Sequence, residues 1–354
     1  MTALPEAGFW RGRRVLVTGH TGFKGAWLCR ALHSLGAAVT GIALNPPPGP
    51  SAFAVLEVAP ILAADHRADI RDAEGVAALV RGARPEVVLH LAAQALVGDG
   101  YRDPAGTFAT NCGGTIALLQ ALRGLEGVAA ALIVTSDKVY ANDGAGRAFT
   151  EADRLGGADP YSASKAAAEI AVASWRASFG RELPPLATAR AGNVIGGGDF
   201  GKERLVPDLV RAIQAGEPLL LRRPDATRPF QHVLDVLRGY LLLAERLATA
   251  PAPAALNLGP RDGECAVRDL LAQWEAATGV PVAWRQIEGP VMDESRRLAL
   301  DSTLAERALG WTPRYDTPRA IAETASWYAG WLRGVPMLPA SEAAIRDCFL
   351  GNGT

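Results

Sequence analysis

The chain has 354 residues, of which 49% are hydrophobic, and a formal net charge of −1 at pH 7. This length exceeds the usual size of one hydrophobic core, so we expect a large domain with a smaller one attached. The small net charge gives no reason to expect a nucleic acid or an anionic membrane as partner. No signal-peptide pattern or long apolar run predicts export or membrane insertion, so we expect a cytoplasmic protein.

Residues 14–18 are typical of a short buried strand, and a glycine-rich turn leads from them into an apolar-periodic helix. The turn carries Gly19, Gly22 and Gly25, a spacing different from the commoner GxGxxG. Helix N–H groups and the helix dipole at such a turn attract a pyrophosphate. The alternative is an ordinary strand-to-helix turn, but the flanking strand and helix favour dinucleotide binding.

Strand candidates alternate with helix candidates along the first half of the chain. The further strands are expected at residues 39–44, 87–91, 131–135 and 186–191. The helices are expected at residues 72–81, 104–123, 160–179, 206–215, 233–246 and 266–278. Strands that alternate with helices predict an α/β fold of the Rossmann type, with a doubly wound parallel sheet. The four cysteines follow neither a zinc-binding nor a disulfide spacing, and we interpret them as reduced thiols.

The regular alternation of strands and helices ends after residue 191. A glycine triplet at 196–198 begins a region of short, irregular elements. We therefore predict a Rossmann domain over residues 1–191, rejoined by about residues 232–258. Residues 192–354 are expected to form mainly a smaller α/β domain that binds the substrate.

The expected cofactor edge of the sheet holds several polar or small residues. Asn45 follows the second strand. This position has neither the acid that binds the ribose 2′-hydroxyl of NAD nor an arginine for the 2′-phosphate of NADP. Asp69 and Ile70 could contact an adenine, although a turn and helix cap is the simpler interpretation. The small residues at 90–94 fit a backbone that runs close under a cofactor, or simply good packing.

Tyr161 and Lys165 lie four residues apart and therefore share one face of the expected helix. There the ammonium group would lower the pKa of the phenol and let it shuttle a proton beside a cofactor. The alternative is a partly exposed tyrosine and a solvated lysine. Ser136, Asp137 and Lys138 supply more acid-base groups than a simple dehydrogenase needs.

The glycine turn, Asn111 and the Tyr161-x-x-x-Lys165 pair resemble, in this order, an extended short-chain dehydrogenase/reductase. Longer runs are similar to the CDP-glucose branch of the sugar-nucleotide 4,6-dehydratases. These runs span residues 19–27, 43–47, 135–140, 159–165, 190–199 and 228–233. The resemblance implies NAD as cofactor, a nucleotide sugar as substrate, and a place in deoxysugar synthesis such as that for lipopolysaccharide O-antigen.

The resemblance also implies roles for the acid-base residues. Tyr161 would take the C4 hydroxyl proton during hydride transfer, with Lys165 tuning it and Ser136 donating a hydrogen bond to O4. Asp137 would protonate the departing C6 hydroxyl. Lys138, where the dTDP-glucose branch has Glu, would be the C5 base, which requires a pKa well below the ordinary value of about 10.4. Alternatively, Lys138 only pairs with Asp137 or a diphosphate.

Two sets of binding residues follow from the motifs and the resemblance. The expected cofactor contacts are Gly19, Thr21, Gly22, Phe23, Lys24, Gly25, Asn45, Asp69, Ile70, Leu91, Ala92, Ala93, Gln94, Asn111, Thr135, Tyr161 and Lys165. The expected substrate contacts are Gln94, Ser136, Asn193, Arg204, Arg228, His232 and Arg296. Arg204 and Arg228 would clamp the diphosphate, because a guanidinium binds phosphate oxygens bidentately. Alternatively, they are surface residues beside acidic neighbours.

The sequence departs from the family pattern at Gly98-Asp99-Gly100, where a basic residue is expected, and at Asp293, where the family often has His. These departures leave a different nucleotide sugar open as substrate. A 4-epimerase or decarboxylase on the same fold is an alternative activity, and a non-catalytic dinucleotide-binding protein is another. The family commonly dimerises through the helices at 104–123 and 160–179, which predicts a homodimer or a dimer of dimers.

Overall fold

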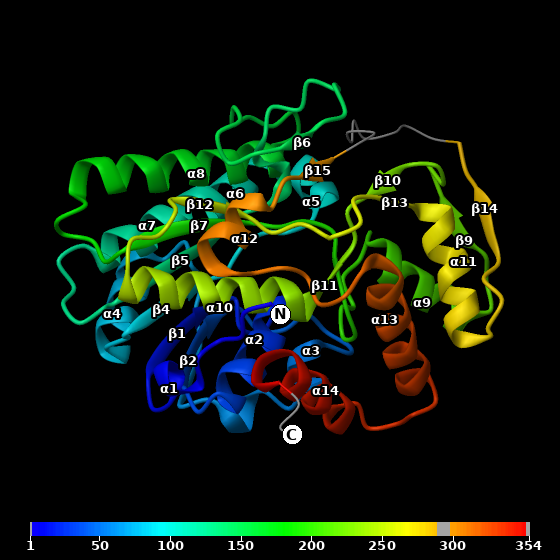
Figure 1. The fold of residues 1–354 in the computed structure, drawn as a ribbon, viewed down its shortest axis with the longest axis horizontal. Coiled ribbons are helices and arrows are strands. Elements are labelled where there is room, and N and C mark those ends of the chain that lie inside the picture. The colour runs from blue at the N-terminus through cyan, green and yellow to red at the C-terminus, as the bar shows by residue number, and fades with distance from the viewer. Residues whose placement is uncertain (1, 289–297, 352–354) are drawn as a thin grey trace.

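A parallel sheet of seven strands forms the centre of the molecule, in the order β12-β7-β5-β4-β1-β2-β3 (Figure 1). The structure is a computed structural model that describes residues 2–288 and 298–351. The strand order reverses between β1 and β4, which is the switch point of a doubly wound sheet. The predicted Rossmann-type α/β fold is therefore confirmed. The strands of this sheet are β1 (Arg14–Thr18), β2 (Ala38–Ala43), β3 (Ala64–Arg67), β4 (Val87–His90), β5 (Ala130–Val134), β7 (Leu186–Arg190) and β12 (Ala255–Asn257).

Helices cover both faces of the sheet, because its buried strands are apolar on both sides. In β1, Val15 and Val17 face one core and Leu16 faces the other. Helices α2 and α10 cover the first face, and α4, α7 and α8 cover the second. The helices are α1 (Ala7–Trp10), α2 (Phe23–Ser34), α3 (Ala52–Val55), α4 (Ala73–Ala83), α5 (Val97–Arg102), α6 (Pro104–Phe108), α7 (Gly114–Leu122), α8 (Pro160–Phe179), α9 (Leu205–Ala215), α10 (Val233–Thr249), α11 (Val267–Thr278), α12 (Thr303–Leu309), α13 (Thr317–Leu332) and α14 (Leu338–Ile345).

The expected helix over residues 104–123 is interrupted. A π-helical turn, η2 (Ala109–Gly113), separates α6 from α7 and contains Asn111. Such a turn inserts one residue into the helix and re-aims its side chains, and it is frequent at functional sites. Periodicity alone did not reveal it.

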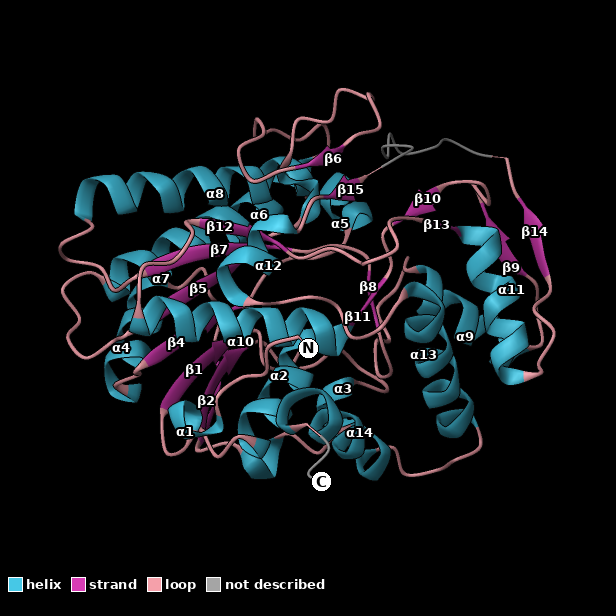
Figure 2. Cartoon of the chain, viewed as in Figure 1, coloured by secondary structure: helices cyan, strands magenta, loops and turns pink. Residues whose placement is uncertain are grey.

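A smaller part of the molecule lies at the carboxyl ends of the strands, on the right of the view in Figure 2. It contains α9, α11 and α13, with α11 packed against α13. Its short strands, and those that connect it to the main sheet, are β6 (Ala148–Phe149), β8 (Val194–Ile195), β9 (Leu219–Leu221), β10 (Thr227–Arg228), β11 (Gln231–His232), β13 (Cys265–Ala266), β14 (Trp284–Gln286) and β15 (Ala299–Leu300).

Two later segments return to the sheet. Strand β12 pairs with β7 at the sheet edge, and α14 packs beside α2. The division of the chain into two domains near residue 191 stays a prediction. It includes the return of about residues 232–258, where β12 lies, but not the packing of α14 beside α2. Within the described residues, no helix combines the length and apolar character needed to cross a membrane.

Candidate active site

The glycine turn between β1 and α2 requires glycine for steric reasons. Gly19 has a φ of 77°, and a Cβ there would lie 2.7 Å from the backbone nitrogen of Ala92. A Cβ at Gly25 would overlap the carbonyl oxygen of Gly19. The helix begins after Gly22, and no described side chain caps its first N–H groups. These free donors and the tight backbone fit the pyrophosphate of a dinucleotide.

The side chains of the turn hold it against the next strands. The Thr21 hydroxyl donates to the carbonyl oxygen of Leu44, just before the exposed Asn45. The buried His20 ring lies 2.8 Å from the Asp65 carboxylate, and burial lowers the pKa of His20. The sequence analysis missed this contact, because 45 residues separate the two partners.

Asp69 lies in a turn before α4. Its carboxylate accepts a hydrogen bond from the backbone N–H of Arg71 and pairs with the Arg71 guanidinium, which lowers the pKa of Asp69. The next acid, Asp72, caps α4. The preferred interpretation as turn and cap is therefore confirmed, with Asp72 as the cap, while a contact of Asp69 or the buried Ile70 with adenine stays a prediction.

Asn111 joins the loop after β4 to helix α8. Its Oδ1 accepts a hydrogen bond from the backbone N–H of Gln94 at 2.8 Å, and its Nδ2 donates to Ser164 Oγ at 2.9 Å. The Gln94 amide itself donates to Leu96 and Thr107 within the loop. Asn111 therefore fixes the loop on which the expected cofactor residues lie, and direct contacts of Gln94 with cofactor or substrate stay predictions.

Ser136, Asp137 and Lys138 all line one pocket, directly after the end of β5. The Ser136 hydroxyl donates to the Asp137 carboxylate at 3.0 Å, and the Asn193 amide lies 3.3 Å from the other carboxylate oxygen. Burial raises the pKa of Asp137, and Lys138 is the main opposing cause. A Cβ at Gly192 would overlap the Asp137 carboxylate, so glycine is required behind the acid.

Tyr161 and Lys165 share one face of α8, as predicted. Burial raises the pKa of Tyr161, a hydrogen bond with Ser136 opposes this, and Asp137 raises it further. The expectation that the phenol has a lowered pKa is therefore wrong for this structure. Burial lowers the pKa of Lys165 to about 7, and its Nζ donates to the carbonyl oxygen of Val134.

Lys24 projects into the same pocket from the first turn of α2. Burial lowers the pKa of its amine to about 8, with the nearby charge of Arg204 as the second cause. The charge of Lys24 also contributes to the lowered pKa of Lys165. From the sequence, Lys24 was expected only as a residue of the cofactor turn. Its place near Asp137 and Lys165 is visible only in the fold.

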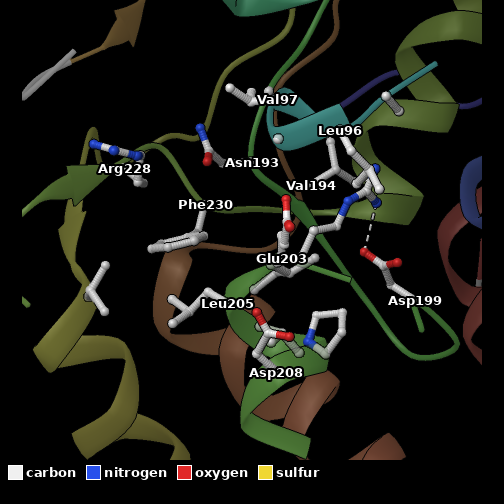
Figure 3. Close-up of a pocket in the computed structure, with 18 of the residues that line it drawn as sticks. Leu96, Val97, Asn193, Val194, Asp199, Glu203, Leu205, Asp208, Arg228 and Phe230 are labelled. Atoms are coloured by element: carbon white, nitrogen blue, oxygen red, sulfur yellow. Dashed lines mark hydrogen bonds and ion pairs between the residues drawn. The ribbon is translucent and has the colours of Figure 1, made fainter. Parts of the chain in front are cut away.

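The pocket has a volume of about 630 Å³, and its lining includes Asp137, Lys138 and Tyr161 together with residues of the smaller part of the molecule. Figure 3 shows Arg228 on one side and Asp199 on the other, and Asp199 pairs with Arg204 at 2.9 Å. Many lining residues of the smaller part are apolar, among them Leu205, Leu219, Leu220, Leu221, Phe230, Val267 and Ile287. Arg222 and Arg223, which follow Leu221 in sequence, also line the pocket.

The departure at residues 98–100 has a local explanation. The Glu203 carboxylate lies directly over Gly98, where a Cβ would overlap it. Arg102 pairs with both Glu203 and Asp99, but it is exposed and lies outside the pocket lining. A Cβ at Gly100 would lie 3.2 Å from the backbone nitrogen of Tyr161, so this glycine lets α5 approach α8 closely.

His232 lies outside the pocket lining. It is buried against Tyr315, with ring centroids 4.5 Å apart, and its Nδ1 accepts a bond from the backbone N–H of Leu234 at the start of α10. Burial lowers its pKa to about 3, so the ring is neutral near pH 7. A substrate contact of His232 stays a prediction. Arg296 and Asp293 lie outside the described residues.

Known proteins resemble this chain over nearly its whole length. A CDP-glucose 4,6-dehydratase of Salmonella typhimurium is 38% identical over 351 residues, which cover 97% of this chain and 98% of that protein. A dTDP-glucose 4,6-dehydratase of Streptomyces griseus is 30% identical and covers 92% of this chain and 97% of its own.

Solved structures agree with the fold. A dTDP-glucose 4,6-dehydratase from Streptomyces venezuelae, solved with NAD bound, has a TM-score of 0.77 and 27% identity, over 90% of this chain and 98% of its own. A UDP-glucose 4-epimerase from Stenotrophomonas maltophila, also with NAD bound, has a TM-score of 0.79 and 27% identity, over 91% of this chain and 100% of its own. The model of the NAD dependent epimerase/dehydratase family matches residues 15–259. The chain therefore belongs to the NAD dependent epimerase/dehydratase family.

Proposed function

We propose that the protein is a nucleotide-sugar 4,6-dehydratase that converts CDP-glucose to CDP-4-keto-6-deoxyglucose. The observation that carries the proposal is the presence of an acid and an amine, Asp137 and Lys138, in one pocket with Tyr161. A 4-epimerase or a decarboxylase needs the tyrosine and the hydride acceptor, but no adjacent acid for loss of water. The relative from Salmonella typhimurium supports the nucleotide and the sugar.

The first step is oxidation at C4. NAD, held at the glycine turn of residues 19–25, would supply the hydride acceptor for C4 and, once Lys138 returns a proton to C5, the hydride donor for C6. Tyr161 takes the proton of the C4 hydroxyl, and Ser136, which bonds to Tyr161, donates a hydrogen bond to O4. Burial raises the pKa of Tyr161, so only its minor ionised form takes this proton. Over the whole cycle the proton replaces the one that Asp137 gives to the leaving water, because the product keeps the ketone at C4.

The second step is loss of water across C5 and C6. The 4-ketone acidifies the C5 hydrogen, which Lys138 removes as a base. Asp137 donates its proton to the C6 hydroxyl as that group leaves. The raised pKa of Asp137 suits this role, since a buried carboxyl retains its proton more readily than an exposed one.

The diphosphate requires cations, and Arg204 and Arg228 line the same pocket as Asp137, Lys138 and Tyr161. Asp199 holds Arg204 by an ion pair and fixes the direction of its guanidinium. The apolar lining residues of the smaller part are suited to the flat nucleoside base. The hexose would then lie beside Ser136 and Tyr161.

Mass spectrometry on purified protein tests the proposal with a panel of CDP-, dTDP-, GDP- and UDP-hexoses. We expect CDP-glucose to give a product one water lighter than the substrate, without net consumption of NAD. An isobaric product separated by chromatography would instead identify an epimerase. Loss of carbon dioxide from a nucleotide hexuronic acid, added to the panel, would identify a decarboxylase. Stoichiometric reduction of NAD would identify a simple dehydrogenase, and absence of any turnover would favour a binding protein.

We also propose a homodimer in the cytoplasm, or a dimer of dimers, assembled through α6, α7 and α8. Large apolar side chains stand exposed on these segments, with Phe108 at 39% and Ile170 at 59% exposure. A second copy that covers them would remove this apolar surface from water. Sedimentation at micromolar concentration tests the proposal, and a monomer alone would contradict it. A role in O-antigen synthesis stays a prediction.

A further inference from the structure

Glu169 and Arg190 form a buried ion pair close to Tyr161 and Lys165. Glu169 is on α8, four residues after Lys165 and eight after Tyr161, and therefore shares their helix face. Its carboxylate accepts two hydrogen bonds from Arg190, from Nε at 3.0 Å and from Nη2 at 2.8 Å. The side chains of Glu169 and Arg190 are only 4% and 5% exposed. Neither touches the pocket, so the proposed reaction does not use them directly.

The Glu169–Arg190 pair is bonded to both ends of the segment of residues 135–140, here named the catalytic segment. At one end, the Thr135 hydroxyl donates to Glu169. At the other end, Arg190 Nη1 donates to the Tyr140 hydroxyl at 2.8 Å. The Tyr140 hydroxyl in turn donates to Asn257 Oδ1 at 2.6 Å, on the edge strand β12.

Ser136, Asp137 and Lys138 are the residues between these two anchors. Thr188 on β7 donates to the second Glu169 oxygen at 2.8 Å, so the network also joins α8 to the sheet. Nearly every polar group of the network is therefore satisfied without water. Such a buried network fixes one geometry, because breaking any bond leaves an unpaired polar group.

We propose that the Glu169–Arg190 ion pair, through Thr135 and Tyr140, positions Ser136, Asp137 and Lys138 relative to Tyr161 and Lys165. The inference rests on the proposed function. Oxidation at C4 depends mainly on Tyr161 and Lys165 of α8, with Ser136 as an auxiliary donor, whereas loss of water depends on Asp137 and Lys138, which both lie between the anchors. Loosening the anchors therefore slows the elimination more than the oxidation.

The test compares Arg190→Lys and Tyr140→Phe with the wild-type holoenzyme. Arg238→Lys is a matched control, because Arg238 forms a fully buried ion pair with Asp235 that is remote from the pocket. We expect kcat for dehydration to fall about tenfold or more in both test variants, with KM within about twofold. Reduced nicotinamide should accumulate on the enzyme during turnover, since the elimination that allows its reoxidation is slowed.

The control separates positioning from stability. Arg238→Lys should lower the melting temperature as Arg190→Lys does, but leave kcat per folded enzyme and the level of reduced nicotinamide unchanged. The inference is overturned if Tyr140→Phe keeps the wild-type kcat, if KM rises in place of the fall in kcat, or if reduced nicotinamide does not accumulate. Wild-type protein without dehydratase activity would instead contradict the proposed function.

Discussion

Among the residues of the pocket, Asp137 and Lys138 decide which chemistry is possible. They are neighbours in sequence, yet Asp137 is almost fully buried while Lys138 is half-buried. Asp137 lies between the Ser136 hydroxyl and the Asn193 amide, which hold the carboxylate in place. An acid held in this way can deliver a proton to one position only, which is what loss of a specific hydroxyl requires.

Replacement of Lys138 by Met tests its role as the C5 base. We expect dehydration and solvent-deuterium exchange at C5 to fall about a hundredfold or more, since a general base contributes about this much. Lys202→Met is the matched control, because Lys202 is exposed. If exchange and dehydration in Lys138→Met proceed at nearly the wild-type rate, Lys138 is not the base.

Replacement of Asp137 by Asn separates activity from stability. Because the folded state raises the pKa of this carboxyl, ionised Asp137 costs folding free energy, and this cost appears as the pH rises above its ordinary pKa. Asp137→Asn should therefore raise the unfolding free energy near pH 7 by about 1 kcal/mol, and the melting temperature with it. The same replacement should abolish dehydration. Calorimetry and product analysis check the two effects, and a lowered melting temperature would contradict the first.

At the scale of elements, the site depends on backbone positions that admit no side chain. Gly19 and Gly25 close the turn before α2, and Gly192 follows β7 directly behind Asp137. Gly100 lets α5 lie close to the start of α8, because a Cβ there would lie 3.2 Å from the backbone nitrogen of Tyr161. Parallel strands end at one edge of the sheet, so these loops converge there without any contact between them in sequence.

Gly192→Ala should displace the Asp137 carboxylate, because the added methyl group would overlap it. We expect kcat to fall about tenfold or more and the protein to lose about 1–3 kcal/mol of stability. Gly82→Ala is the matched control, since Gly82 lies in α4 with open space around its Cα. The control should gain about 0.5–1 kcal/mol from helix propensity. Equal kcat values for the two variants would refute the steric argument.

Across the whole molecule, α10 carries a buried acid, Asp235, and a half-buried acid, Glu245, that hold distant segments. Asp235 accepts from the backbone N–H groups of Arg314 and Tyr315 and so fixes the chain before α13. Glu245 accepts from the Trp10 indole and the Glu6 N–H and so fixes α1. The N-terminal helix α1 and the chain before α13 are therefore both held by α10, which covers one face of the sheet.

Glu245 should make stability depend on pH. Burial raises its pKa to about 7, above the ordinary value near 4.5. Between these values the folded state holds more protons than the unfolded state, so this group lowers stability as the pH rises from about 4.5 to about 7. Glu245→Gln should raise the melting temperature above pH 7 and flatten its slope in that window. An unchanged slope in a pH series of thermal unfolding would contradict this.

The sequence by itself determined the elements that depend on local patterns. Helix α8, the glycine turn and five strands of the main sheet follow from periodicity, proline and glycine, whereas β3 and β12 were not among the expected strands. It also indicated Tyr161 and Lys165, because four residues make one helical turn. Local patterns could not reveal the π-helical turn around Asn111, or the pairing of β12 with β7, since both depend on packing against distant segments.

Only the tertiary structure decided the electrostatics of the site. Burial, which no local pattern measures, sets the pKa of Tyr161 above its ordinary value and lowers that of Lys165 to about 7. The approach of Lys24 to the reacting groups and the anchoring of the catalytic segment by Glu169 and Arg190 also come from the fold. The physical reason is that sequence fixes which groups are present, whereas charge and hydrogen bonding depend on which groups the fold brings together and removes from water.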